Sequence, residues 1–175
     1  TVVDTELQHN KKKVHTASKQ VVIGWTGSHS TLKYLEQLLP VLEKVFHQMP
    51  FQLLVIADRP LAASFPNISK KKWNATSEIE DLLQIDIGIM PLDDDAWSEG
   101  KCGFKIIQYM ALGIPAVAAA VGVNNKIIQH GVNGFLAHNQ EQWVAHLLSL
   151  LAQASLRSSM GEAAVQRINA HYSIH

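Results

Sequence analysis

Apolar and polar positions alternate in blocks along the chain, and the blocks predict strands and helices in turn. Short apolar runs at 21–23, 51–57, 85–90, 116–119 and 134–137 predict buried strands, because strands covered on both faces read as continuous hydrophobic segments. The more polar segment 68–73 is interpreted as a further short strand. Apolar residues recur at spacings of three and four from Leu32 to Phe46, which predicts an amphipathic helix.

Further helices are predicted at 76–84, 103–112, 124–130, 140–153 and 155–171. The alternation of strand and helix indicates an α/β fold: a Rossmann-like three-layer sandwich with a mostly parallel sheet of about six strands and helices on both faces. Such sheets bind ligands at the carboxyl ends of their strands. The loops in which to look for function are therefore 24–31, 58–66, 73–76, 91–104 and 120–124.

The polar start of the chain is distinct from the rest. Residues 1–19 include a run of three lysines and are interpreted as a leader or linker from a missing N-terminal domain, outside the core, with residues 20–175 as the folded domain. These first residues lack the apolar segment of a signal peptide, so we expect a cytoplasmic protein.

One uncharged segment, 106–125, is long enough to suggest a membrane span. Gly113 and Pro115 interrupt it, so we expect a helix that ends at Gly113 and a buried strand that follows Pro115. No transmembrane segment is therefore predicted.

Composition narrows the classes of function. The chain has 175 residues, is 47% apolar and 17% charged, and carries a net charge of zero. The apolar content excludes a largely disordered protein, and the balanced charge argues against a nucleic-acid binder. The single cysteine, Cys102, excludes a disulfide framework and a cysteine-based zinc site. The nine histidines form no HExxH motif, so no metal site is expected.

The first candidate for chemistry is the turn after the first strand, with Gly27, Ser28 and His29 at its centre. Small residues let a backbone approach a ligand, and the helix that follows attracts anions at its amino end. The segment matches neither a GxGxxG motif nor a Walker A motif. An ordinary capped turn remains the alternative.

The second candidate is the start of the helix predicted at 103–112. A turn flanked by glycines directs the backbone amides of Cys102, Gly103 and Phe104 into the crevice. Lys101 and Lys105 lie beside them, so a diphosphate would meet amides, a helix dipole and ammonium groups together. One helical turn later, Gln108 is placed to bind a ribose hydroxyl. The alternative is that both lysines are solvated and Gln108 is an ordinary polar position.

The third candidate is the acidic loop that contains Asp93, Asp94, Asp95 and Glu99. Paired carboxylates hold Mg²⁺ or perform acid–base catalysis in some sites. Adjacent aspartates in a loop point in different directions, so the interpretation that they are solvated is preferred.

Three segments then resemble the glycosyltransferase group 1 family. They read DIGIMPL from Asp86, WSEGKCGFKIIQYMALGIPAVA from Trp97, and VGVNNKIIQHGVNGFLA from Val121. The resemblance implies a GT-B fold of two Rossmann-like domains, of which this chain is the C-terminal, donor-binding one. It also implies a retaining transferase without metal or other cofactor. By the same resemblance, the donor is expected to be a nucleotide-diphosphate sugar, and the acceptor a glycan or lipid bound through the missing N-terminal domain.

The resemblance also assigns roles to single residues. The second glutamate of the family's motif, a ribose ligand, falls on Gln108, and the first falls on Gly100, so Glu99 is the candidate for contact with the sugar. The basic residues that usually follow the first strand are absent, and Lys101 and Lys105 are expected to replace their charge. By its position, Trp73 is expected to border the base.

Three functions stay open at this point. The first is the donor-binding domain of a glycosyltransferase, inactive without its partner domain and peripheral to a membrane only through that domain. The second is a GT-B nucleotide-sugar epimerase, for which Glu99 and His29 are the acid–base candidates. The third is a non-catalytic nucleotide-binding module, which the replaced glutamates favour.

Overall fold

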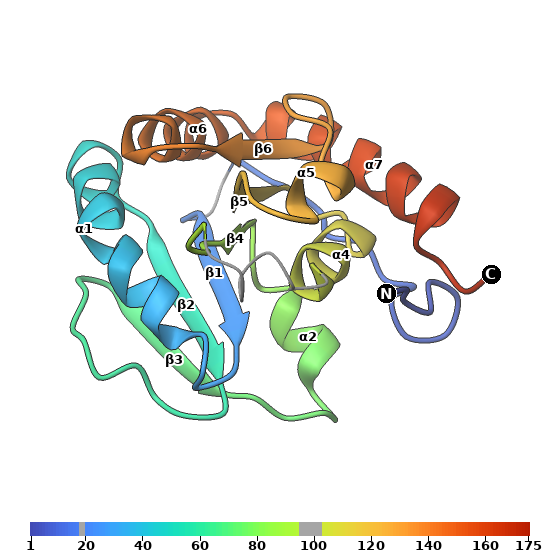
Figure 1. Cartoon of the computed structure of the whole chain (residues 1–175), viewed down its shortest axis with the longest axis horizontal. Helices are drawn as coiled ribbons and strands as arrows, with labels where there is room; N and C mark the ends of the chain where they lie inside the picture. The colour runs from blue at the N-terminus through green and yellow to red at the C-terminus, as the bar shows by residue number, and fades with distance from the viewer. Residues whose placement is uncertain (18–19, 95–102) are drawn as a thin grey trace.

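The computed structural model describes residues 1–17, 20–94 and 103–175, and its strands form one six-stranded sheet (Figure 1). The strands are β1 (Val22–Gly27), β2 (Gln52–Ala57), β3 (Ile68–Lys72), β4 (Ile87–Met90), β5 (Ala116–Ala119) and β6 (Gly134–Ala137). Every pairing is parallel, and the order is β3-β2-β1-β4-β5-β6. The predicted α/β fold class is confirmed.

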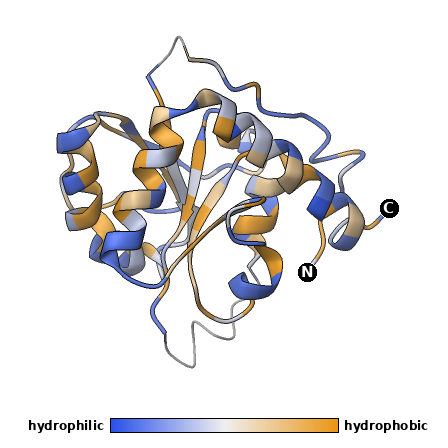
Figure 2. Ribbon diagram, turned by 90° about the horizontal axis from the view of Figure 1, so that it is seen from above, coloured by the Kyte–Doolittle hydropathy of each residue, from blue (hydrophilic) through white to orange (hydrophobic). Residues whose placement is uncertain are grey.

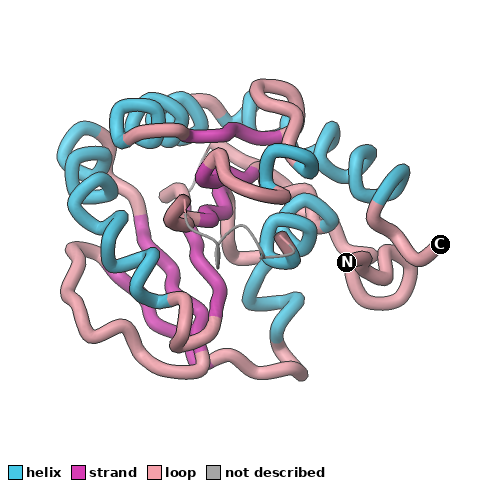
Figure 3. Tube along the Cα trace, in the orientation of Figure 1, coloured by secondary structure: helices cyan, strands magenta, loops and turns pink. Residues whose placement is uncertain are grey.

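Helices cover both faces of the sheet (Figures 1 and 3). They are α1 (Leu32–Gln48), α2 (Glu78–Leu82), α4 (Phe104–Ala111), α5 (Asn124–Ile127), α6 (Gln140–Ala152) and α7 (Ala154–His171). Helices α1 and α6 pack together on one side, whereas α2, α4 and α5 lie on the other. Helix α7 contacts both α6 and α4, so it joins the two helical layers.

The alternation of side chains along the strands produces two hydrophobic cores. Trp25 and Val55 point toward α1 and α6, whereas Leu54 and Ile56 point toward α2 and α4. Figure 2 shows the apolar strands at the centre and the hydrophilic sides of the helices facing outward. Burial on both faces explains why the strands read as continuous apolar runs.

The first strand is longer than its apolar run predicts. It continues through Trp25 and Thr26 to Gly27, because these residues keep parallel pairing with β2 up to Ala57. The predicted turn at 24–31 is therefore wrong in its first half, and only Ser28–Thr31 connects β1 to α1.

The N-terminal segment does not stay outside the core. Val3 is 3% exposed and forms a β-bridge with Ser173 near the other end of the chain. Lys12 donates to the carbonyl oxygen of Ala111, and the ring of His15 contacts the carbonyl oxygen of Gly113 at 2.9 Å. Residues 1–17 thus pack along the end of α4, where a peripheral linker was expected.

The uncharged segment 106–125 folds as its glycine and proline predict. Helix α4 ends at Ala111, and β5 begins at Ala116, directly after Pro115. Within the described ranges, every helix is too short or too polar to cross a membrane.

Candidate functional site

The strand order changes direction between β1 and β4, and the region outside the carboxyl ends of these two strands is called the crevice below. These strands pair only at Ile23–Ile87 and Gly24–Gly88 and then separate. The phenol of Tyr109 fills the gap: its oxygen accepts from the amide of Thr26 at 3.1 Å and donates to the carbonyl oxygen of Ile89 at 3.2 Å. In open parallel sheets this change of direction is where ligands bind.

Gly88 allows Tyr109 to reach that position. A Cβ atom at Gly88 would lie 2.5 Å from the Tyr109 ring, so any side chain there would displace the ring. Burial raises the pKa of Tyr109, which keeps the phenol neutral and able both to donate and to accept. Through Tyr109, helix α4 therefore forms hydrogen bonds with the carboxyl ends of both β1 and β4.

The amino end of α4 lies beside this crevice. Gly103 precedes the helix in the left-handed conformation, with a φ of 68°, and has no side chain to cap it. The carbonyl oxygen of Gly103 accepts from Ile107, which leaves the amides of the first helical turn without partners inside the helix. Phe104, at the first position, is 42% exposed. Such a terminus favours an anion.

Lys105 brings its ammonium group to the end of β1. Its Nζ donates to Thr31 Oγ1 at 3.1 Å and lies 4.7 Å from the centre of the Trp25 ring. A Cβ atom at Gly27 would be only 2.4 Å from this Nζ, so the ammonium rests against the bare backbone. The structure thus brings together Gly27 and Lys105, two residues that the sequence singled out.

The turn between β1 and α1 is held by a residue that the sequence analysis missed. Asp58 follows β2 and accepts from the backbone amide of His29 at 2.6 Å, and its other oxygen lies 2.7 Å from His29 Nδ1. The hydrogen bond to His29 lowers the pKa of Asp58. Ser28 is exposed, and its carbonyl oxygen accepts from Thr31 Oγ1. The sequence analysis singled out the loop 58–66 because it follows a strand at the carboxyl edge of the sheet. It did not single out the carboxylate of Asp58 within that loop.

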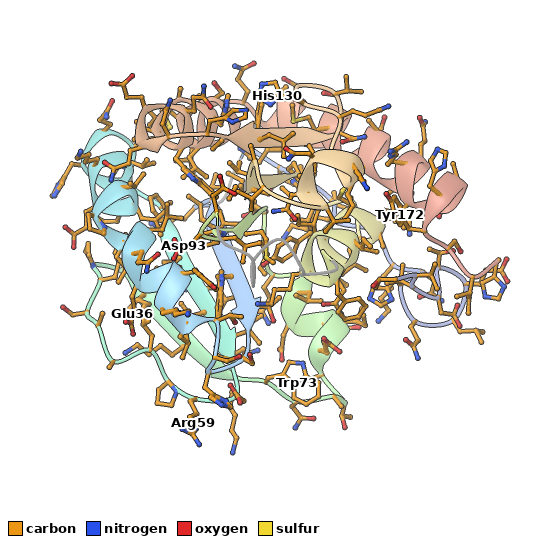
Figure 4. The ribbon with its side chains drawn as sticks, viewed as in Figure 1. Glu36, Arg59, Trp73, Asp93, His130 and Tyr172 are labelled. Atoms are coloured by element: carbon orange, nitrogen blue, oxygen red, sulfur yellow. The ribbon has the colours of Figure 1, made fainter. Side chains whose placement is uncertain are left out.

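Gln108 is almost completely buried, with 3% exposure, and its amide nitrogen donates to Glu78 Oε1 at 3.0 Å. Glu78 begins α2, and the sequence pattern did not single it out as a site residue. Trp73 follows β3 on the connection to α2 and is 41% exposed. Figure 4 shows Trp73 and Arg59 at the same end of the molecule, beyond the carboxyl ends of β3 and β2.

Four residues of the predicted sites lie outside the described residues: Asp95, Glu99, Lys101 and Cys102. Asp93 and Asp94, which precede the gap, are exposed. Among the described residues, no three histidine, cysteine, aspartate or glutamate side chains are grouped so as to hold a metal ion.

A second hollow of about 340 Å³ opens at the same edge of the sheet, lined in part by Gln37, Asp93 and His138. It lies on the side of the sheet that α1 and α6 cover. Lys105 and Gln108, which belong to α4, do not line this hollow.

Comparison with known proteins gives a family match. The sequence profile described as Glycosyl transferases group 1 matches residues 20–153. No curated protein sequence matches the chain significantly.

Solved structures share the fold. The C-terminal domain of the glycosyl transferase group 1 family protein LpcC from Francisella tularensis has a TM-score of 0.74 and 16% identity, covering 99% of this chain and 100% of that one. A point mutant of S. aureus TarM in complex with fondaparinux, alpha-GlcNAc-glycerol and UDP has a TM-score of 0.70 and 21% identity, covering 94% and 36%. Anabaena HepE in complex with UDP and glucose has a TM-score of 0.66 and 17% identity, covering 88% and 45%. The chain thus spans about a third of TarM and less than half of HepE.

Proposed function

Because the chain belongs to the glycosyl transferases group 1 family, we propose that it is the part of a retaining glycosyltransferase that binds a nucleotide-diphosphate sugar. The whole enzyme transfers that sugar to a glycan or lipid acceptor, which the remainder of the protein holds. The single observation that carries the proposal is the contact of the Lys105 ammonium, which belongs to the first turn of α4, with the end of β1.

The charge of this crevice suits a diphosphate. Backbone amides at the start of α4 present partial positive charge, and the ammonium of Lys105 adds a full one beside them. Transfer of a sugar leaves negative charge on the departing diphosphate, and fixed donors stabilise such charge most when they are already in place. Lys105 is in place, because Thr31 and the face of Trp25 hold it.

The same arrangement supports a reaction without a metal ion. In many enzymes Mg²⁺ neutralises a leaving diphosphate, whereas here the helix terminus and Lys105 supply that charge. Gly27, Ser28 and His29 approach the diphosphate or the sugar from the opposite side, on the turn that Asp58 holds. Trp73 borders the base.

Binding of nucleotides by the chain tests the proposal. UDP and GDP are titrated into it by calorimetry in buffer with EDTA, and at least one is expected to bind saturably. Lys105→Met keeps most of the side-chain stem and removes the ammonium, so it should weaken binding about tenfold, the usual loss for one charged hydrogen bond.

Lys44→Met is the matched control, because Lys44 is exposed on α1. Its affinity should equal that of the unaltered chain. The phosphate role of Lys105 is refuted if both substitutions leave the affinity unchanged, and binding that appears only when Mg²⁺ is added contradicts the metal-independent site.

A further inference from the structure

The hydrogen bond between Gln108 and Glu78 joins two helices at the crevice. Gln108 is buried on α4, and its amide nitrogen is already engaged by Glu78 Oε1 at 3.0 Å. Glu78 is half-buried in the first turn of α2. A buried amide that donates to a carboxylate fixes the position of that carboxylate, since leaving the pair would cost the amide its partner.

The second oxygen of the Glu78 carboxylate remains an acceptor. Gln108 occupies Oε1, and among the described residues neither a hydrogen bond nor an ion pair is formed by Oε2. An ionised carboxylate has about four acceptor positions. A half-buried one with most of them unused is suited to hydroxyl donors of a ligand, because charge-assisted hydrogen bonds are strong.

Glu78 also lies at the right place relative to the amino end of α4. Gln108 is five positions after Gly103, which corresponds to a rise of about 7.5 Å along the helix. A carboxylate at the phosphate position would repel the ligand. If the diphosphate lies at the helix start, the Glu78 carboxylate that Gln108 binds is displaced from it by that length, toward the neutral part of a nucleotide that carries hydroxyl groups. Trp73 lies at the start of the same β3–α2 connection.

We propose that Glu78, positioned by Gln108, is the residue that binds the 2′- and 3′-hydroxyls of the ribose and so selects ribonucleotides over deoxyribonucleotides. The inference rests on the proposed function, because it concerns the same nucleotide site. Gln108 then acts through Glu78 as a positioning residue, and the negative charge at the ribose comes from α2.

The experiment compares each nucleotide with its deoxy analogues. UDP, GDP and ADP are titrated into the chain, and the tightest binder is measured again as its 2′-deoxy and 3′-deoxy forms. The unaltered chain should bind at least one deoxy form about tenfold more weakly, the loss expected for one hydrogen bond to a charged group. In Glu78→Gln the ribonucleotide should bind more weakly. The ratio of ribonucleotide affinity to deoxynucleotide affinity should then fall toward one.

Glu80→Gln is the matched control: it removes the same charge from the same helix, at an exposed side chain that pairs with Lys11. Its ratio should not change. Gln108→Leu leaves Glu78 intact and removes its partner, so the ratio should fall there as well. Thermal unfolding of each variant verifies that it is folded, and Gln108→Leu provides the test if Glu78→Gln is not.

The outcomes separate the two proposals. If no nucleotide binds the unaltered chain, the proposed function and this inference are both overturned. If the nucleotide binds but the ratio of ribose to deoxyribose affinity is the same in Glu78→Gln and Glu80→Gln, only the role of Glu78 is overturned.

Discussion

Arg157 shows how a single charged residue is tolerated in the core. Its side chain is 2% exposed, and the guanidinium donates to the carbonyl oxygens of Leu150 and Leu151, at the end of α6, and of Thr16. These carbonyl groups lack partners within their own helix or segment. Arg157 therefore caps α6 and fixes the N-terminal segment against it.

Replacement of Arg157 should be costly for this reason. Arg157→Leu leaves buried carbonyl groups without donors, so we expect the free energy of unfolding to fall by about 3 kcal/mol. Urea denaturation at neutral pH measures the change. Arg59→Leu, at an exposed position, should change it by less than about 0.5 kcal/mol. Equal effects of the two substitutions would show that the cap contributes nothing.

At the scale of residues, spacing along the chain predicted one part of the site and missed the other. Gly103 and Lys105 are neighbours in sequence, and a helix start beside a lysine is readable from that alone. Glu78 and Gln108 are 30 positions apart, and their contact depends on how α2 packs beside α4. No local pattern encodes that packing, so the pair emerged only from the structure.

At the scale of elements, α4 carries most of the site. Its amino end, Lys105 and Gln108 serve the crevice, Tyr109 joins β1 to β4, and Ile106 and Met110 lie in the core. Lys105 and Gln108 are three residues apart, which places them on one face of the helix. The sequence predicted this helix at 103–112, within one residue of both observed ends, because glycines at 103 and 113 mark them.

The packing of the N-terminal segment against the domain is a feature that the sequence did not predict. Its polar composition indicated a peripheral linker, yet Lys12 and His15 bond to backbone carbonyls at the end of α4. The aliphatic part of a lysine side chain can pack against the domain while its ammonium group donates to the carbonyl oxygens at the end of a helix. A polar composition alone does not indicate such packing.

Two histidines of this segment, His9 and His15, should make its attachment depend on pH. Burial lowers the pKa of both below the usual 6.5. The unfolded chain then binds these protons more readily than the folded one, so the stabilisation is complete above pH 6.5 and is lost as pH falls through the lower pKa values. We expect the melting temperature to decrease between pH 7 and pH 5.

The substitution His15→Gln tests the origin of that decrease, since glutamine also donates to a carbonyl but does not titrate. The fall in melting temperature should become smaller in this variant. His47→Gln is the control, because His47 is exposed at the end of α1. A pH profile altered equally by both variants would contradict the assignment to buried histidines.

At the scale of the whole molecule, the sheet brings three loops to one edge. Five apolar runs and the more polar segment 68–73 predicted six strands in a mostly parallel sheet, and the general rule for such sheets then placed the site at their carboxyl ends. The order of the strands could not be predicted from the sequence pattern, because it depends on which helix packs on which face of the sheet. That order puts β1 beside β4 and so creates the crevice between the His29 turn and α4.

The central claim is that this edge binds a nucleoside diphosphate, and mapping of amide signals by NMR tests it most directly. The ¹⁵N-labelled chain is titrated with UDP and with GDP. The account predicts saturable shifts centred on Ser28, His29, Phe104 and Lys105, spreading to Glu78. The absence of shifts at millimolar nucleotide, or shifts confined to the opposite edge around Lys12 and Gly161, would contradict it.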